Sequence, residues 1–549
     1  MFGGLYLNSE ISNKSKSSVS FVSGFFILSF STVIVKILGL VYKIPMLSYL
    51  GAEGMGYFNS AYEIFALLCI VATAGLPTAL SILISSYRES AEIGRIKQIY
   101  KCAYRIFLII GIAGTVFMLT LAGPISSAIK NQGAYLSIMA VAPAFLCVCI
   151  SSLIRGYYQG YSCMLPTAIS QLLEALGKLA FGIVFASLAL KRGFDIQVIA
   201  AFAVLGLSVG MLISTLFLAI LKLNDRRLNV NLNFDIQTNS VDNNSITQLL
   251  KIAFPVTLSS TVIGSTRIVD MVLIMRRLQD IGYTEGVANE FYGAYTTIAL
   301  PIFSLIPALL APISMALIPS LSSAIQNASF FHQGEIVKNA IRITVIISLP
   351  SALAMILYSR PIISLLFHDV VFELEYVSVL LSLLGASILF SCMITTTNAI
   401  LQSYRHTNKP IISITVGVII KFVVAYLLMG IPEINIYGAP ISTFFCDLAI
   451  VVINLMFIGK VTSFKLSTKT VYMMPLLASI ISLVISYSIY SVLFIKTSSM
   501  AASFLIIIPI TIVLYISLSL LFKSINVQDI KMLPMGDKIY FVFNKLRIK

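Results

Sequence analysis

Long apolar stretches dominate this chain, and they restrict it to one class of fold. A helix needs about 20 apolar residues to cross the hydrocarbon core of a bilayer, and fourteen stretches of that length lie between residues 21 and 522. Backbone groups find no water inside a bilayer, so such stretches cross it as helices. With 11% charged residues, the chain also has far fewer charges than a soluble domain. We predict an all-α polytopic membrane protein with fourteen transmembrane helices.

The predicted spans have approximate bounds that follow the apolar runs. They are 21–42, 57–84, 104–123, 134–154, 164–188, 197–221, 249–275, 291–319, 338–358, 376–402, 410–430, 436–459, 471–494 and 499–522.

The basic residues between the spans predict the orientation. Lys and Arg are enriched in cytoplasmic segments. With a cytoplasmic N-terminus, 25 of the 37 Lys and Arg fall inside, 8 outside and 4 within spans. We therefore expect a multi-pass protein of the cell membrane with both termini in the cytoplasm. In this orientation most basic residues face the anionic lipids of the cytoplasmic leaflet. The net charge of +15 therefore needs no nucleic-acid partner to explain it.

Two parts of the chain resemble each other, which predicts an internal repeat. KCAYRI (101–106) matches KNAIRI (338–343), and QGYSCMLPTAIS (159–170) resembles QSYRHTNKPIIS (402–413). The offsets correspond to six helices, and repeats of equal orientation imply a pseudo-twofold axis along the membrane normal. We expect an N-terminal lobe (1–222), a cytoplasmic linker (223–248), a C-terminal lobe (249–460), two further helices (461–523) and a cytoplasmic amphipathic tail (524–549).

Charged residues within the spans mark the candidate site. Ionisable groups at this depth usually face a bundle interior or a watery cavity; the alternative is that they pair structurally or reach toward an interface. The helical spacings of Glu174 with Lys178 and of Arg267 with Asp270 put each pair on one helix face. A cationic cavity suits an anionic substrate such as a phosphate or diphosphate. The four cations are Lys36, Lys178, Arg267 and Lys421, and the four acids are Glu63, Glu174, Asp270 and Asp447.

The four acids within the spans would serve as ion-coupling or charge-pairing sites.

Sequence motifs for catalysis and for metal or cofactor binding are missing from the chain. No GxxxxGK[ST] loop is present, so ATP hydrolysis by this chain is not expected. The three histidines are scattered and the seven cysteines show no CxxC spacing. We predict no catalytic residues, no metal site, no cofactor and no enzyme activity.

Three segments carry a family resemblance: KILGLVYKIPMLSYLGAEGMGYFNSAYEIFALLCIVATAGLPTALSILISSYRE (36–89), LPTAISQLLEALGKLAFGIVFA (165–186) and MALIPSLSSA (315–324). They resemble the stage V sporulation protein B group of the polysaccharide-exporter branch of the multidrug/oligosaccharidyl-lipid/polysaccharide exporter superfamily. That superfamily also contains the lipid II flippases.

The resemblance implies two six-helix lobes with a cationic central cavity, and a groove for a polyprenyl tail formed with the last two helices. It places Lys36 at a functionally important basic position of helix one in the lipid II flippases. Their next basic position falls on Tyr42, with Lys43 adjacent, so Lys43 joins the candidate head-group ligands. Their charged residues of helix eight map near 294–301, which carries no charge here.

The predicted function is a flippase that moves an undecaprenyl-diphosphate-linked sugar precursor across the cytoplasmic membrane by alternating access. Lipid II or a related polysaccharide precursor would be the partner, for cell-wall, spore-cortex or polysaccharide synthesis, with cell-wall synthases as further candidate partners. The main alternative is an ion-coupled multidrug antiporter of the same superfamily. A glycan polymerase would need large outer loops with catalytic groups, and a purely structural partner of cell-wall synthases stays open.

Overall fold

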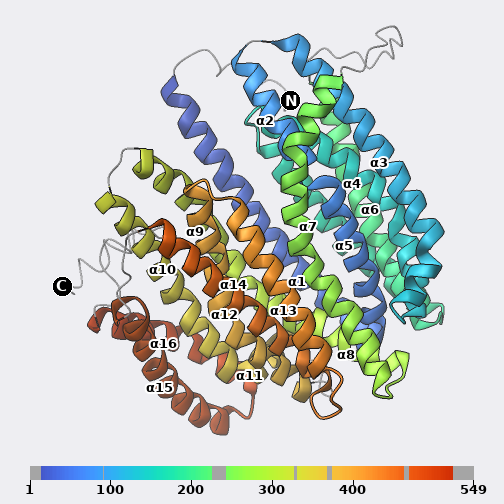
Figure 1. The fold of residues 1–549 in the computed structure, drawn as a ribbon. Coiled ribbons are helices and arrows are strands. Elements are labelled where there is room, and N and C mark those ends of the chain that lie inside the picture. Colours follow the sequence, from blue (N-terminus) through green and yellow to red (C-terminus); the bar gives the residue numbers. More distant parts are fainter. Residues whose placement is uncertain are drawn as a thin grey trace. The chain divides into compact units, whose positions relative to one another are not determined.

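The structure is a computed structural model that describes residues 14–90, 92–225, 243–326, 330–367, 374–462 and 469–522. Within these ranges all regular structure is helical (Figure 1). The helices are α1 (Lys14–Thr73), α2 (Leu76–Glu89), α3 (Ile93–Ala128), η1 (Gln132–Ala134), α4 (Tyr135–Gly160), α5 (Leu165–Lys191), α6 (Ile196–Leu223), α7 (Asn243–Asp280), α8 (Glu285–Ala294), η2 (Tyr295–Ala299), α9 (Leu300–Gln326), α10 (Phe330–Leu357), α11 (Ser359–Leu366), α12 (Leu374–Ser403), α13 (Asn408–Leu428), η3 (Asn435–Tyr437), α14 (Gly438–Val461), η4 (Lys469–Met473), α15 (Met474–Thr497) and α16 (Met500–Leu521).

Thirteen helical stretches of the described residues are long and apolar enough to cross a membrane. The first, Ser31–Arg88, has 58 residues and includes most of both predicted spans 21–42 and 57–84. At 1.5 Å per residue it is far longer than one bilayer crossing requires. The prediction of an all-α polytopic membrane protein is confirmed, while the count of fourteen helices is not confirmed.

A single glycine interrupts α1 and explains why two predicted spans fall in one helical stretch. Gly51 has φ 62° and ψ −178° inside an otherwise helical run. Only glycine adopts such a conformation without strain, because it has no Cβ. The chain therefore changes direction at Gly51 without a loop. Helix α1 ends at Thr73. Pro77 lies in the first turn of α2, where its missing N–H costs no hydrogen bond.

The chain divides into two compact units, residues 1–268 (unit 1) and 269–549 (unit 2). The division falls within α7. Most of the predicted linker 223–248 and all of the predicted tail 524–549 lie outside the described residues.

Glycines bring α5 and α6 into close contact in unit 1. A Cβ built on Gly177 of α5 would lie 2.6 Å from Cα of Gly210 of α6, and Gly206 meets Gly182 in the same way. Small residues allow this kind of close packing between membrane helices. The contact also fixes the position of Lys178, whose backbone nitrogen lies 2.6 Å from a Cβ built on Gly210.

We expect Gly210→Leu to destabilise unit 1, because the new side chain has no space between α5 and α6. Overpacking of this kind costs about 1–3 kcal/mol, which should lower the melting temperature of the purified protein by several degrees. Gly94→Leu is the matched control, since a Cβ there meets nothing within 4 Å. Equal melting temperatures for the two variants would contradict the close contact.

Unit 2 has one large apolar core and a smaller one. The larger includes Leu321, Ile341 and Ile400, contributed by α9, α10 and α12, and α14 packs against it through Val451. The smaller joins α15 and α16 to Tyr358 through Leu483 and Ile507.

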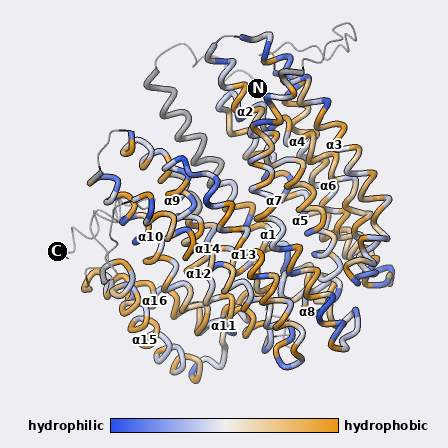
Figure 2. Tube along the Cα trace, viewed as in Figure 1, coloured by the Kyte–Doolittle hydropathy of each residue, from blue (hydrophilic) through white to orange (hydrophobic). Residues whose placement is uncertain are grey.

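Apolar side chains also cover the outside of both units. Figure 2 shows apolar residues along the helices, with hydrophilic residues concentrated toward many helix ends and connections. Many large apolar side chains are exposed, among them Ile109 of α3, Leu216 of α6, Leu427 of α13 and Val513 of α16. Exposed apolar surface on this scale is typical of a protein whose surroundings are lipid.

Candidate functional site

Six of the predicted site residues lie in unit 1 and come from three helices. Lys36 and Lys43 lie before Gly51 in α1, and Glu63 lies after it. Helix α5 contributes Glu174 and Lys178, and α7 contributes Arg267.

Arg267 and Glu63 connect α7 to α1. Arg267 Nη1 lies 3.6 Å from Glu63 Oε1, and the two side chains are 63% and 14% exposed. Lys36 is exposed and interacts electrostatically with Arg267. The Glu63 carboxylate is therefore ion-paired, while Lys36 and Arg267 remain accessible.

Lys43 and Lys178 form the deeper part of the same cluster. Both are partly buried. Lys43 interacts electrostatically with Lys178, Glu63 and Arg267. Lys178 interacts with Glu174 and Glu63. The four basic residues predicted as ligands in unit 1 therefore belong to one connected set, here called the unit 1 cation cluster (Lys36, Lys43, Lys178 and Arg267).

Three aromatic rings surround the ammonium group of Lys178. Its Nζ lies 4.7 Å from the ring centroid of Tyr62, 5.0 Å from that of Tyr42 and 5.6 Å from that of Phe58. These distances allow cation–π attraction. Phe58 and Tyr62 are four residues apart on α1, so both rings lie on the same helix face. We call Tyr42, Phe58 and Tyr62 the aromatic cage.

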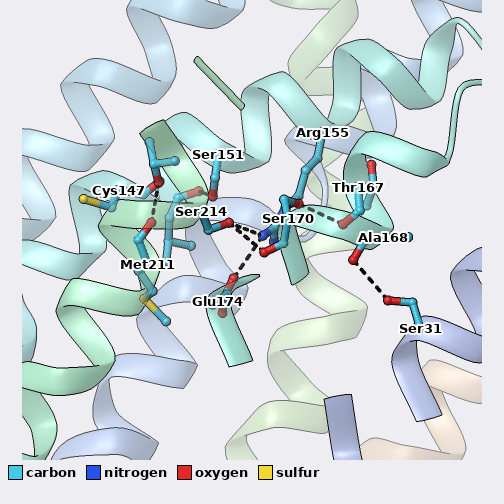
Figure 3. A network of polar contacts seen from close by, with 12 residues as sticks. Ser31, Cys147, Ser151, Arg155, Thr167, Ala168, Ser170, Glu174, Met211 and Ser214 are labelled. Atoms are coloured by element: carbon cyan, nitrogen blue, oxygen red, sulfur yellow. Dashed lines mark hydrogen bonds and ion pairs between the residues drawn. The ribbon is translucent and has the colours of Figure 1, made fainter. Parts of the chain in front are cut away.

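Arg155 of α4 is the centre of a polar network in unit 1 (Figure 3). Its Nη2 donates to Glu174 Oε2 at 2.9 Å and to Ser214 Oγ at 3.2 Å, and its Nε donates to Ser170 Oγ at 2.9 Å. Ser214 Oγ donates to the carbonyl of Ser170 at 2.9 Å. The guanidinium thereby connects α4, α5 and α6, which positions the turns of α5 that carry Glu174 and Lys178.

The charges of unit 1 do not balance. The cation cluster and Arg155 provide five positive groups, while Glu63 and Glu174 provide two negative ones. Five minus two leaves a formal excess of three positive charges. Lys43, Lys178 and Arg155 are only partly exposed. Charge of one sign that is partly removed from water is costly without a partner, so this part of unit 1 favours an anionic ligand.

The remaining predicted site residues lie in unit 2, where the balance has the opposite sign. Lys421 Nζ of α13 donates to Asp270 Oδ2 of α7 at 2.7 Å, with both side chains almost completely buried. Asp447 of α14 interacts electrostatically with both residues. One ammonium and two carboxylates leave a formal charge of −1. We call Asp270, Lys421 and Asp447 the unit 2 triad.

Three ion pairs of the predicted site residues join neighbouring helices. Glu174 pairs with Arg155 rather than closely with Lys178, four residues along the same helix. Arg267 pairs with Glu63, and Asp270 pairs with Lys421. Groups on neighbouring helices approach more closely than groups on one helix, and single-sequence spacing contains no information about them.

Sequence reasoning missed Arg155 and the aromatic cage. The predicted span 134–154 ends just before Arg155, whereas α4 continues to Gly160. The spacing of Phe58 and Tyr62 was a usable signal for the cage. Within the described part of the chain, no group of three or more His, Cys, Asp or Glu is placed to hold a metal ion.

Two known protein families match most of the chain. Residues 21–325, more than half of the sequence, match the polysaccharide biosynthesis protein family, and residues 293–427 match the MatE family.

Three relatives come from Bacillus subtilis (strain 168). The uncharacterized membrane protein YabM is 26% identical over 438 residues, which are 79% of this chain and 79% of the relative. The lipid II flippase MurJ is 24% identical, covering 85% of this chain and 88% of the relative. Stage V sporulation protein B is 21% identical, covering 94% and 98%. The predicted resemblance is confirmed.

Solved structures share the fold. A lipid II flippase MurJ in an inward closed conformation has a TM-score of 0.69 at 17% identity, covering 90% of this chain and 98% of the other. An inward-facing multidrug resistance MATE family transporter of the MOP superfamily has a TM-score of 0.64 at 16% identity, covering 80% and 98%.

Proposed function

Since this chain belongs to the polysaccharide biosynthesis protein family, we propose that it is a flippase for a polyprenyl-diphosphate-linked sugar precursor. The observation that supports this most directly is the excess of positive charge in unit 1. The relatives include a lipid II flippase, and the similar folds belong to a flippase and a transporter rather than to enzymes.

The unit 1 cation cluster would hold the diphosphate. Lys36 and Arg267 are accessible and would meet the head group first. Lys43 and Lys178 are more buried, and they would neutralise the negative charge of the diphosphate as it enters the cluster. Lysine binds phosphate as a point charge, and arginine binds it through two parallel hydrogen bonds. The unit 1 cation cluster provides both kinds of contact without requiring a metal ion.

Transport would proceed by alternating access in the membrane, with the lipid tail remaining in the bilayer. In the predicted orientation both termini lie in the cytoplasm, and the precursor moves from the inner to the outer leaflet. Glu63 and Glu174 would limit the affinity for the diphosphate, because each offsets one nearby cation. Lipid II is the first candidate substrate and a teichoic or capsular precursor the second. Cell-wall synthases would then be partners downstream.

The second candidate function is a multidrug antiporter, which the MATE-like fold favours. A site for cationic drugs would need a negative excess. The charges of unit 1 have the opposite sign, and this is why we favour the flippase.

The proposal is tested by reconstitution into vesicles with fluorescent diphosphate-linked lipids that carry different head groups. Wild-type protein should move at least one of them between leaflets. Lys36→Gln combined with Arg267→Gln should reduce the rate by about 10–100-fold, as expected for loss of charge-assisted contacts. The fraction of label accessible to an external reductant measures this movement.

Lys191→Gln serves as the control, because Lys191 is exposed at the end of α5 and lies outside the cluster. It should leave transport unchanged. Failure to move any diphosphate lipid, together with proton flux in response to cationic drugs, would contradict the flippase and support the antiporter.

A further inference from the structure

The internal repeat gives α3 a counterpart in α10. Phe330, the first residue of α10, follows Ile93, the first residue of α3, by 237 positions, and KNAIRI (338–343) follows KCAYRI (101–106) by the same number. Each helix packs within its own unit, α3 against α2 and α4, and α10 against α9 and α12. Residues of α3 can therefore be compared with residues of α10 one by one.

One face of α10 is covered by helices that follow the second lobe. Helix α15 and η4 pack against α10, and the hydroxyl of Tyr515 of α16 donates to the carbonyl of Ile346 at 2.8 Å. On this face Leu349 is 6% exposed and Arg342 is 5% exposed. A basic residue and the apolar residues that follow it are thus enclosed by protein.

The equivalent face of α3 is open. Arg105 takes the place of Arg342, and Ile112 takes the place of Leu349. Arg105 is exposed, and Ile112 is 50% exposed where its counterpart is buried. Figure 1 shows α3 at the edge of unit 1. We call this face the α3 stripe, and its residues, at intervals of three or four, are Lys97, Lys101, Arg105, Ile109, Ile112 and Val116.

The basic end of the α3 stripe lacks an ion-pair partner among the described residues. Lys97, Lys101 and Arg105 are four residues apart, and like charges at this spacing destabilise a helix. Within the described ranges no carboxylate pairs with any of the three, whereas the neighbouring Arg95 pairs with Glu92 at 2.7 Å. The basic end therefore favours an external anion.

The rest of the α3 stripe is apolar and about as long as one leaflet is thick. Ile109, Ile112 and Val116 continue it, and each is half or more exposed. Arg105 and Val116 are separated by about 16 Å along the helix axis, and the hydrocarbon core of a bilayer is about 30 Å thick. A ligand with an anionic group at one end and a hydrocarbon chain at the other matches both parts of the stripe, which a soluble anion does not.

A membrane helix would fit the α3 stripe less well than a lipid. It would remove three like charges from water, which is costly unless each of them gains a partner. The covered face of α10 carries less charge, because Gly334 stands in the place of Lys97. The phosphate of a lipid at the membrane surface neutralises basic residues while they stay in contact with water.

We propose that the α3 stripe binds an anionic phospholipid, with the phosphate held by its three basic residues and an acyl chain lying along its three apolar ones. The lipid covers on α3 the face that protein covers on α10. In the predicted orientation the lipid belongs to the inner leaflet. The inference is independent of the proposed function, because it requires no transport.

Fluorescence quenching by brominated lipids tests this site. The chain contains no tryptophan, so Ile112→Trp places one indole in the α3 stripe. The purified full-length protein is reconstituted in vesicles of phosphatidylglycerol and phosphatidylcholine, with bromine on the acyl chains of one lipid or the other. One basic residue near a lipid surface contributes about fivefold in binding. Quenching should therefore show a preference of about tenfold or more for phosphatidylglycerol.

Two matched controls accompany this measurement. Val513→Trp places the indole at an exposed position of α16, a helix that contains no Lys or Arg, and should be quenched equally by both lipids. In the Ile112→Trp protein, Lys101→Gln with Arg105→Gln should reduce the preference by about tenfold. The pair Lys191→Gln and Arg192→Gln, at exposed positions where α5 ends, should leave it unchanged.

Three results would overturn the inference. The first is equal quenching of Ile112→Trp by both lipids, which would show an ordinary lipid-facing surface. The second is a preference that the Lys101 and Arg105 double variant retains. The third is no quenching by either lipid, which would show that a second copy of the chain covers this face. Because none of these readouts involves transport, failure of the flippase proposal would leave them unchanged.

Discussion

Replacement of Lys421 by methionine should destabilise the folded protein by about 3–5 kcal/mol, the usual cost of removing one partner of a buried ion pair. The ammonium is 2.7 Å from Asp270, with both side chains almost fully buried. Without it, two acidic residues of the triad remain, the buried Asp270 and the partly buried Asp447. The melting temperature of the purified protein, measured at several pH values, gives the effect.

A double variant separates the loss of the pair from a general packing defect. Lys421→Met combined with Asp270→Leu should recover part of the lost stability, because only one of the two triad carboxylates, Asp447, then remains. Lys191→Met, at an exposed position, should have little effect. If Lys421→Met is as stable as the wild type, or if the double variant is as unstable as Lys421→Met, the ion pair does not make this contribution to stability.

Replacement of Lys178 by methionine should reduce lipid transport by about 10–100-fold, since one charge-assisted contact contributes about 1.5–3 kcal/mol. Lys178 is the member of the unit 1 cation cluster that the protein positions most tightly, between three aromatic rings. The loss should appear mainly as weaker binding, measured as a higher substrate concentration for half-maximal transport.

The aromatic cage allows a graded version of the same test. Tyr62→Leu keeps the charge but removes the ring nearest to Nζ. A cation–π contact contributes about 0.5–2 kcal/mol, so this variant should lose less transport than Lys178→Met. Lys191→Met again provides the control. Wild-type transport by Lys178→Met would show that the head group does not use this ammonium.

The helices of this protein could be predicted from its sequence, and the break in α1 could not be placed. Apolar runs locate helices because a bilayer excludes unpaired backbone groups. The turn between the first two predicted spans, however, depends on one residue, Gly51, whose left-handed conformation leaves the surrounding pattern helical. Glycines are common in this chain, so sequence alone does not indicate which of them bends the backbone.

The sequence identifies candidate site residues as charges within apolar runs, but it does not identify their ion-pair partners. Lys36, Lys178 and Arg267 stand out as charges within apolar runs. The ion pairs of Glu174 with Arg155 and of Asp270 with Lys421 join residues 19 and 151 positions apart. Such pairs depend on how the helices pack, which no charge pattern reveals.

The aromatic cage also gives this protein an optical probe. The chain contains no tryptophan, so Phe58→Trp would introduce a single indole emitter beside the ammonium of Lys178. An indole ring binds a cation more strongly than a phenyl ring does, so the replacement retains the attraction. Its emission would then depend on where that one positive charge lies, and binding of an anion in the neighbourhood could be followed in real time without a label on the lipid.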